Sequence, residues 1–193
     1  MKNAIKHVFF GLFFSTALLA QDPADTGADT GADTGADNGA AAAKPVCETM
    51  DAFNDFDFWL GNWNVYSNDE SRSFQGTNAI TKHHQNCLIM ENWTNARGGT
   101  GRSMNYYDPV EDQWRQLWVA GGYSIDYTGG LNETGSMVLT GKINYYKTGK
   151  SQAFRGTWTL NIDGSVRQFF EQQDTASAEW KTWFDGLYIR KIP

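Results

Sequence analysis

The sequence predicts an all-β fold, a closed or nearly closed up-and-down antiparallel barrel of about eight to ten strands. Three observations support this. Short runs of aromatic and β-branched residues recur along the chain, turn residues separate them at short intervals, and no segment shows a sustained helical period. Short links favour antiparallel pairing of consecutive strands, and closing the sheet removes its two exposed edges. A barrel of this size has room for one small ligand.

Residues 1–20 have the pattern of a secretory signal peptide. Lys2 and Lys6 precede an apolar run at 8–14, and small residues follow up to Ala20. The run is shorter than the roughly 20 apolar residues of a transmembrane helix, and no cysteine follows the cleavage region to carry a lipid. We therefore expect a secreted or periplasmic protein without a stable membrane anchor.

Residues 21–46 form an acidic linker in which Ala-Asp-Thr-Gly recurs with a period of four. Such a repeat has no apolar face to bury, so we expect a disordered spacer. The alternative is a weak calcium tract, because Asp25, Asp29, Asp33 and Asp37 recur. The tract lacks the closely alternating oxygen ligands and the closing Glu of a calcium loop, which favours the spacer.

Residues 47–193 have the size of one domain with a sizeable core, and they contain all eight tryptophans. The net charge of the chain is −6, and no cluster of Lys or Arg is interleaved with the aromatic residues. A nucleic acid backbone would therefore find little to bind. The sequence leaves the oligomeric state open.

Cys47 and Cys87 are the two cysteines of the chain. In an exported protein they favour a disulfide that fixes the start of the domain to an early strand. The alternative is a nucleophilic thiolate at Cys87 beside His83 or His84, which an oxidising compartment disfavours.

Ten strands are expected in order along the domain. They lie near residues 60–67, 73–82, 87–95, 101–107, 113–120, 124–127, 136–145, 152–161, 165–173 and 180–190. Turn residues separate them, among them Asp108-Pro109, Gly129-Gly130 and Asp163-Gly164. In the fifth strand Trp114, Gln116, Trp118 and Ala120 share one side, while Arg115, Leu117 and Val119 share the other. Both sides carry bulky residues, so this strand alone does not show which side faces the inside of the barrel.

Several motifs resemble those of the calycin superfamily, and more closely the exported bacterial lipocalin-like domains of unknown function. The first is Phe-Asp-Phe-Trp-Leu-Gly-Asn-Trp at 56–63, which contains a Gly-x-Trp at the start of the first strand. The others are Gly-Thr-Asn at 76–78, Asn-Tyr-Tyr-Asp-Pro at 105–109, Trp-Arg-Gln-Leu-Trp-Val at 114–119 and Phe-Asp-Gly-Leu-Tyr at 184–188. The resemblance covers residues 55–190.

The resemblance implies structural roles for Gly61, Trp63 and Arg190. In lipocalin-like barrels the tryptophan of Gly-x-Trp closes one end, and an arginine from the last strand lies across its indole. The resemblance extends distantly to haem-binding barrels of the nitrobindin kind, which hold iron through a histidine near the end of the chain. Residues 185–193 contain no histidine, so we expect no haem and no other cofactor.

Few residues in the domain are suited to metal or nucleophilic chemistry. His83 and His84 are neighbours on a strand, so their side chains point to opposite faces and cannot share one metal; we expect no metal site. The candidate ligand-binding residues are polar and aromatic side chains interleaved in the strands: Glu91, Trp93, Asn105, Gln116, Trp118, Arg155, Arg167 and Glu171.

Three functional hypotheses follow. The first is an exported barrel that binds a small apolar or aromatic molecule in its lumen. The second is an enzyme of isomerase, cyclase or hydrolase type, with Glu91 or Glu171 as general acid or base and Arg155 or Arg167 stabilising an anion. The third is a non-catalytic interaction module. A large aromatic cavity would favour the first two, and a raised carboxylate pKa within it would favour the second.

Overall fold

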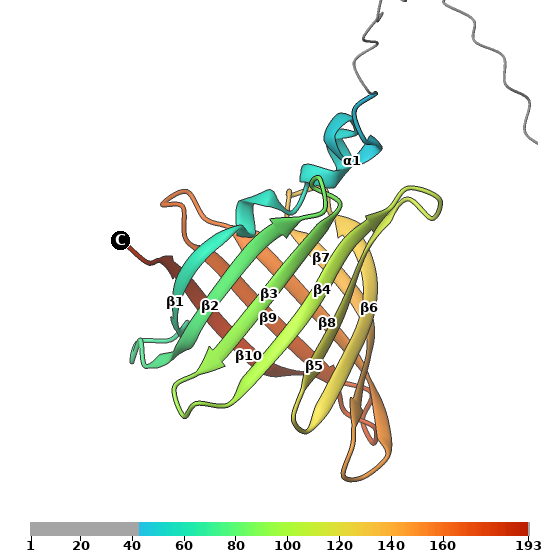
Figure 1. Cartoon of the computed structure of the whole chain (residues 1–193). Helices are drawn as coiled ribbons and strands as arrows, with labels where there is room; N and C mark the ends of the chain where they lie inside the picture. The colour runs from blue at the N-terminus through green and yellow to red at the C-terminus, as the bar shows by residue number, and fades with distance from the viewer. Residues whose placement is uncertain (1–42, 193) are drawn as a thin grey trace, which may run out of the picture. The chain divides into compact units, whose positions relative to one another are not determined.

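The computed structural model describes residues 43–192, which form a closed ten-stranded antiparallel barrel (Figure 1). Each strand pairs with its neighbours in sequence, and the first pairs with the last. The predicted fold class is therefore confirmed. The predicted signal peptide and most of the predicted linker lie outside the described residues.

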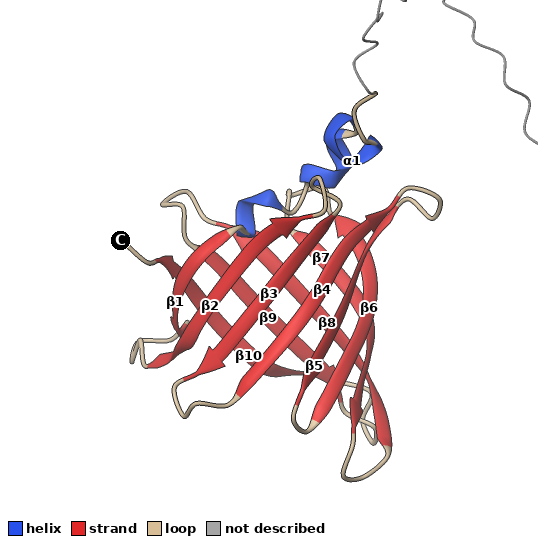
Figure 2. Ribbon diagram, viewed as in Figure 1, coloured by secondary structure: helices blue, strands red, loops and turns tan. Residues whose placement is uncertain are grey.

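The strands follow three short helical elements (Figure 2). These elements are α1 (Val46–Thr49) and the 3₁₀ helices η1 (Asp51–Asn54) and η2 (Asp57–Trp59). The strands are β1 (Gly61–Ser67), β2 (Phe74–His83), β3 (Leu88–Asn95), β4 (Thr100–Asp108), β5 (Gln113–Ala120), β6 (Tyr123–Leu131), β7 (Met137–Tyr145), β8 (Lys150–Leu160), β9 (Val166–Gln173) and β10 (Trp180–Arg190).

Pairing of β1 with β10 closes the barrel. Trp63 lies opposite Arg190, and Ser67 lies opposite Gly186. This is the pairing expected between the terminal strand and the strand that begins at Gly61.

The structure differs from the expectations at several places, one of them His84, which lies in the turn after β2 and not on the strand. Gly129 and Gly130 were predicted to form a turn but lie inside β6, which extends to Leu131. A Cβ on Gly129 would lie 2.0 Å from the carbonyl oxygen of Val138, so the glycine permits a close approach of two strands. The helical elements before β1 were not predicted, because segments of three or four residues are too short to show a helical period.

The segment before β1 fills one end of the barrel with aromatic side chains. Phe56 and Trp59 are fully buried, and their rings stack with centroids 4.9 Å apart. Phe56 also meets Trp114 and Trp158 edge to face. We call this group, with Phe53 and Trp63, the aromatic plug. It closes the end of the barrel next to η2.

The Gly-x-Trp residues hold this end together. The Trp63 indole donates from Nε1 to the Trp59 carbonyl at 2.9 Å, and the Arg190 guanidinium lies 4.5 Å from the Trp63 ring centroid. Arg190 also donates to the Leu60 carbonyl at 3.1 Å. A Cβ on Gly61 would lie 2.6 Å from Arg190 Nη1, and the φ of Gly61 is +132°, so both space and backbone conformation favour glycine there.

A disulfide fixes the same end. Cys47 and Cys87 are bonded with their Cα atoms 5.0 Å apart, which confirms the predicted pair. The bond joins α1 to the turn between β2 and β3. Lys82 adds an ion pair with Asp57 at 2.6 Å.

Within residues 43–192, no helix has both the length and the apolar character that crossing a membrane requires.

Candidate functional site

A cavity of about 200 Å³ occupies the half of the barrel away from the aromatic plug. Its lining includes Gln75 near the start of β2 and Asn95 at the end of β3, which both lie at the end of the barrel opposite η2. We call this end the mouth. Trp183 at the mouth is 36% exposed, so the cavity communicates with solvent there.

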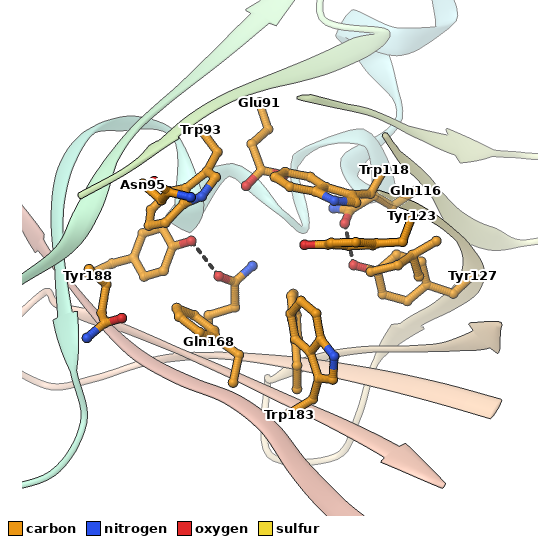
Figure 3. Close-up of a pocket in the computed structure, with 14 residues that line it drawn as sticks. Glu91, Trp93, Asn95, Gln116, Trp118, Tyr123, Tyr127, Gln168, Trp183 and Tyr188 are labelled. Carbon is orange, nitrogen blue, oxygen red and sulfur yellow. Dashed lines mark hydrogen bonds between the residues drawn. The ribbon is translucent and has the colours of Figure 1, made fainter. Parts of the chain in front are cut away.

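Aromatic rings form most of the cavity wall. Figure 3 shows the rings of Trp93, Trp118, Tyr123, Trp183 and Tyr188 around a common space. Strand alternation directs such side chains into the same space, since residues two apart on one strand share a face. The remaining aromatic lining residues are Tyr127, Phe170 and Phe184.

Two glycines let the indoles of Trp93 and Trp118 lie against the barrel wall. A Cβ on Gly76 would lie 2.8 Å from Trp93 Cη2, and a Cβ on Gly101 would lie 2.2 Å from Trp118 Cζ2. A larger residue at Gly101 would push the Trp118 indole toward the lumen, and one at Gly76 would also collide with the backbone of β3, 2.3 Å from the Thr94 carbonyl oxygen. The glycines therefore help to keep the cavity open.

An irregularity in β10 places a further indole in the wall. The register between β9 and β10 shifts between Thr182 and Phe184, and the consecutive residues Trp183 and Phe184 both line the cavity. Trp183 is held by a hydrogen bond from its Nε1 to the Tyr145 hydroxyl at 3.2 Å and by an edge-to-face contact with Tyr123.

A continuous chain of hydrogen bonds between buried side chains runs around the base of the cavity. It crosses from β9 through β10 to β2 and on to β6. We call it the polar belt. Its members are Gln168, Tyr188, Asn78, Glu91, Ser103, Asn105, Gln116 and Tyr127.

On one side of the polar belt every donor points toward Glu91. Tyr127 donates to Gln116, and Gln116 donates to Asn105. Asn105 donates to Ser103 at 2.9 Å, and Ser103 donates to Glu91 Oε2 at 2.6 Å. Glu91 is thus the acceptor at which this series ends.

On the other side of the polar belt Asn78 is the branching donor. Its Nδ2 donates to Glu91 Oε1 at 2.6 Å and to the Tyr188 hydroxyl at 3.2 Å, and Tyr188 donates to Gln168. Asn78 Oδ1 is buried without a hydrogen-bond partner among the described residues. Burial raises the pKa of Tyr188 well above its usual value, so its hydroxyl remains a donor at neutral pH.

Glu91 is the carboxyl group of this site. It is 3% exposed, and burial raises its pKa to about 7, although the hydrogen bonds from Ser103 and Asn78 act in the opposite direction. A carboxyl group with this pKa can hold or release a proton near neutral pH.

Trp118 offers a free donor beside it. Its Nε1 is buried, and within residues 43–192 it lies near the Tyr123 hydroxyl without the geometry of a full hydrogen bond. Because an unpaired buried donor costs about 1 to 3 kcal/mol, an acceptor atom on a bound molecule would relieve that cost.

The structure brings together five of the eight predicted ligand-binding residues. Glu91, Trp93, Gln116 and Trp118 line the cavity, and Asn105 lies behind them in the polar belt. The sequence did not show which side of β5 faces the inside of the barrel. In the structure Trp114, Gln116 and Trp118 face inward.

The other three predicted residues lie on the outer face of β8 and β9. Arg155 pairs with Glu171 at 2.6 Å, and Arg167 pairs with Asp185 at 2.7 Å. They alternate with the inward-facing Phe154 and Phe170, and none of them lines the cavity. The enzyme hypothesis paired a carboxylate in the lumen with Arg155 or Arg167. Both arginines lie outside the lumen, so that pairing does not form.

Several residues of the site were not predicted from the sequence: Asn78, Ser103, Tyr123, Tyr127, Gln168, Phe170, Trp183, Phe184 and Tyr188. A usable signal existed for Asn78 and Gln168. Asn78 lies in phase with Gly76 and Ile80, and Gln168 with Val166, so each is a polar residue within a buried series. Trp183 had no such signal, because the irregularity in β10 breaks the alternation.

Among residues 43–192, no three His, Cys, Asp or Glu side chains gather in a group that could hold a metal ion. The chain matches no protein-family model and no curated protein. The function is therefore inferred from the residues of the site itself.

Proposed function

We propose that this protein is an exported, calycin-like binding protein that holds one small, largely apolar or aromatic molecule in the mouth half of its barrel. The single observation that carries the proposal is the aromatic cavity of about 200 Å³, with the polar belt at its base. A barrel filled by its own side chains would have favoured an interaction module.

The size of the cavity sets the size of the ligand. An apolar cavity of about 150 Å³ holds benzene, so this one, which opens at the mouth, accommodates a molecule of roughly eight to ten non-hydrogen atoms. Rings of Trp93 and Trp118 supply apolar contact, and Trp118 Nε1 and the Gln168 amide supply polar contact that would orient the ligand.

Export is supported by the Cys47–Cys87 disulfide, because such bonds persist mainly in oxidising compartments. The N-terminal sequence pattern points the same way.

The proposal can be tested by native mass spectrometry of the protein as purified and after exposure to a library of small apolar metabolites. Bound mass should appear together with quenching of tryptophan fluorescence. Trp118→Ala should weaken binding by ~1 to 3 kcal/mol, as loss of an aromatic contact does. Trp180→Ala is the matched control, because Trp180 stacks on Arg155 at the outer face. Equal loss in both variants would contradict the assigned site.

A second candidate is an enzyme that uses Glu91 as a general acid or base. The observation that favours it is the pKa of Glu91, raised to about 7 by burial in a cavity wall. Turnover of a bound molecule that is lost in Glu91→Gln, with binding retained, would support this function over a carrier.

A further inference from the structure

In the described part of the protein, the cavity combines aromatic walls with one carboxyl group, that of Glu91. Eight of its fourteen lining residues are aromatic. The face of each such ring carries negative electrostatic potential, which attracts a cation and repels an anion. The wall therefore favours a positively charged molecule over a negatively charged one of equal shape.

The charged residues of the site act in the same direction. Glu91 lines the cavity, and within the described part of the chain no Lys, Arg or His does. The guanidinium groups of Arg155 on β8 and Arg167 on β9 face outward and are paired with Glu171 and Asp185. A ligand carboxylate or phosphate would meet Glu91 without a counter-charge, which is costly in a buried site.

Among residues 43–192, Glu91 has no cationic partner. Its two oxygens accept hydrogen bonds from the neutral groups of Asn78 and Ser103, each at 2.6 Å. A carboxylate has further acceptor positions. A buried carboxylate is stabilised in its ionised form by an opposite charge nearby, and a ligand cation would supply that charge. The net charge of −6 on the chain would also raise the local concentration of cations.

We propose that the ligand of this cavity is a small organic cation, a protonated amine or a substituted ammonium, held between the aromatic faces of Trp93, Trp118 and Trp183 with Glu91 as its counter-charge. This inference rests on the proposed binding function and names the ligand class of the same site.

The first test compares three probes of one shape and different charge. Phenyltrimethylammonium, tert-butylbenzene and benzenesulfonate each have about ten non-hydrogen atoms and match the size of the cavity. Titration at pH 8, followed by tryptophan fluorescence and calorimetry, should show that the cation binds at least about tenfold more tightly than the neutral probe. The anion should show no binding.

The outcomes separate the two proposals. Equal or tighter binding of the neutral probe overturns the cation inference and leaves the binding function standing. Binding of the anion in preference to the cation does the same. Failure of all three probes overturns both.

The second test removes the counter-charge. Glu91→Gln should abolish the advantage of the cation over the neutral probe. Glu171 lies on the outer face, so Glu171→Gln should bind the cation in preference to the neutral probe by the same factor as the wild-type protein. If Glu91→Gln keeps this preference as well, the role of Glu91 is refuted.

A pair of tryptophan variants covers the case in which Glu91→Gln fails to fold. Trp183 and Trp180 lie on one strand and are 36% and 37% exposed, but only Trp183 lines the cavity. Trp183→Leu should weaken cation binding several-fold, about the worth of one cation–π contact, and Trp180→Leu should not. Equal effects of the two variants overturn the assignment.

The affinity of the wild-type protein should also depend on pH. The polar-belt groups around Glu91 are Asn78, Ser103, Tyr127 and Tyr188, and burial keeps the tyrosine hydroxyls neutral. With a pKa of about 7 for Glu91, cation affinity should rise about tenfold from pH 6 to pH 8, while the affinity of the neutral probe stays constant. Equal cation affinity at both pH values contradicts a direct role for this carboxylate.

Discussion

Replacing Glu91 by glutamine should change how the free energy of unfolding depends on pH. The folded protein keeps the Glu91 proton up to about pH 7, because burial raises the pKa, whereas the unfolded chain releases it near pH 4.5. Between these values the folded state binds more protons than the unfolded state, so stability falls as pH rises. The stabilising contribution is fully present below pH 4.5 and is lost once the pH passes about 7.

The magnitude follows from the two pKa values. Their difference, about 7 minus 4.5, is about 2.5, and a pKa change of one corresponds to about 1.4 kcal/mol. The wild-type protein should therefore lose about 3 kcal/mol relative to Glu91→Gln between pH 4.5 and pH 8. Glutamine can still accept one hydrogen bond, and rotation of the Asn78 amide would present its unpaired Oδ1 to the new amide group.

Urea denaturation of both proteins at pH 4.5, 6, 7 and 8 measures this change. Changes in packing and hydrogen bonding between the two proteins are largely independent of pH, so they shift the difference in stability by a constant amount. The change of this stability difference with pH therefore reports the titration of Glu91 alone. If the difference between the two proteins stays constant within about 1 kcal/mol over this range, the pKa of Glu91 is not raised in the folded state and the reasoning fails.

Three further perturbations separate stability from binding. Removing the disulfide with Cys47→Ala and Cys87→Ala should cost at most ~4 kcal/mol in thermal or urea unfolding, since it frees a closed loop of roughly 40 residues, and should leave ligand affinity unchanged; a weakened affinity would show that the two ends are coupled. Trp63→Ala should lower unfolding free energy by about 3 to 5 kcal/mol, as loss of a fully buried indole does, so a variant of wild-type stability would contradict its place in the aromatic plug. Gly101→Ala should push the Trp118 indole into the lumen and weaken binding several-fold by calorimetry, because the new Cβ would lie 2.2 Å from the ring; unchanged affinity would show that the ring moves without narrowing the cavity.

The fold was predictable because its signals are local. Alternation and turn residues mark strands one at a time, and short links leave few ways to connect them. The main error in the strands concerned Gly129 and Gly130, which lie inside β6 instead of forming a turn, and of the two Gly129 permits a close backbone approach.

The site was harder to predict because it depends on the phase of each strand. In β8 and β9 both faces carry bulky residues, so the sequence could not assign Arg155 outward and Phe154 inward. In β10 the irregularity adds Trp183 to the wall, and no periodic pattern can show that. Glu91, Gln116 and Trp118 were identified because polar and aromatic residues alternate closely in their strands, but their connection through Ser103 and Asn78 is a property of the closed barrel.

The disulfide and the aromatic plug lie at one end of the barrel, and the cavity opens at the other. On the proposed function, a ligand would enter and leave without breaking the contacts that close the plugged end. In the mouth loops, a Cβ added at Gly98, Gly121 or Gly122 would meet nothing within 4 Å. Insertions or replacements in these loops could alter which molecule enters while the frame beneath them stays intact, a tolerance that directed evolution of new binding proteins from this scaffold could use.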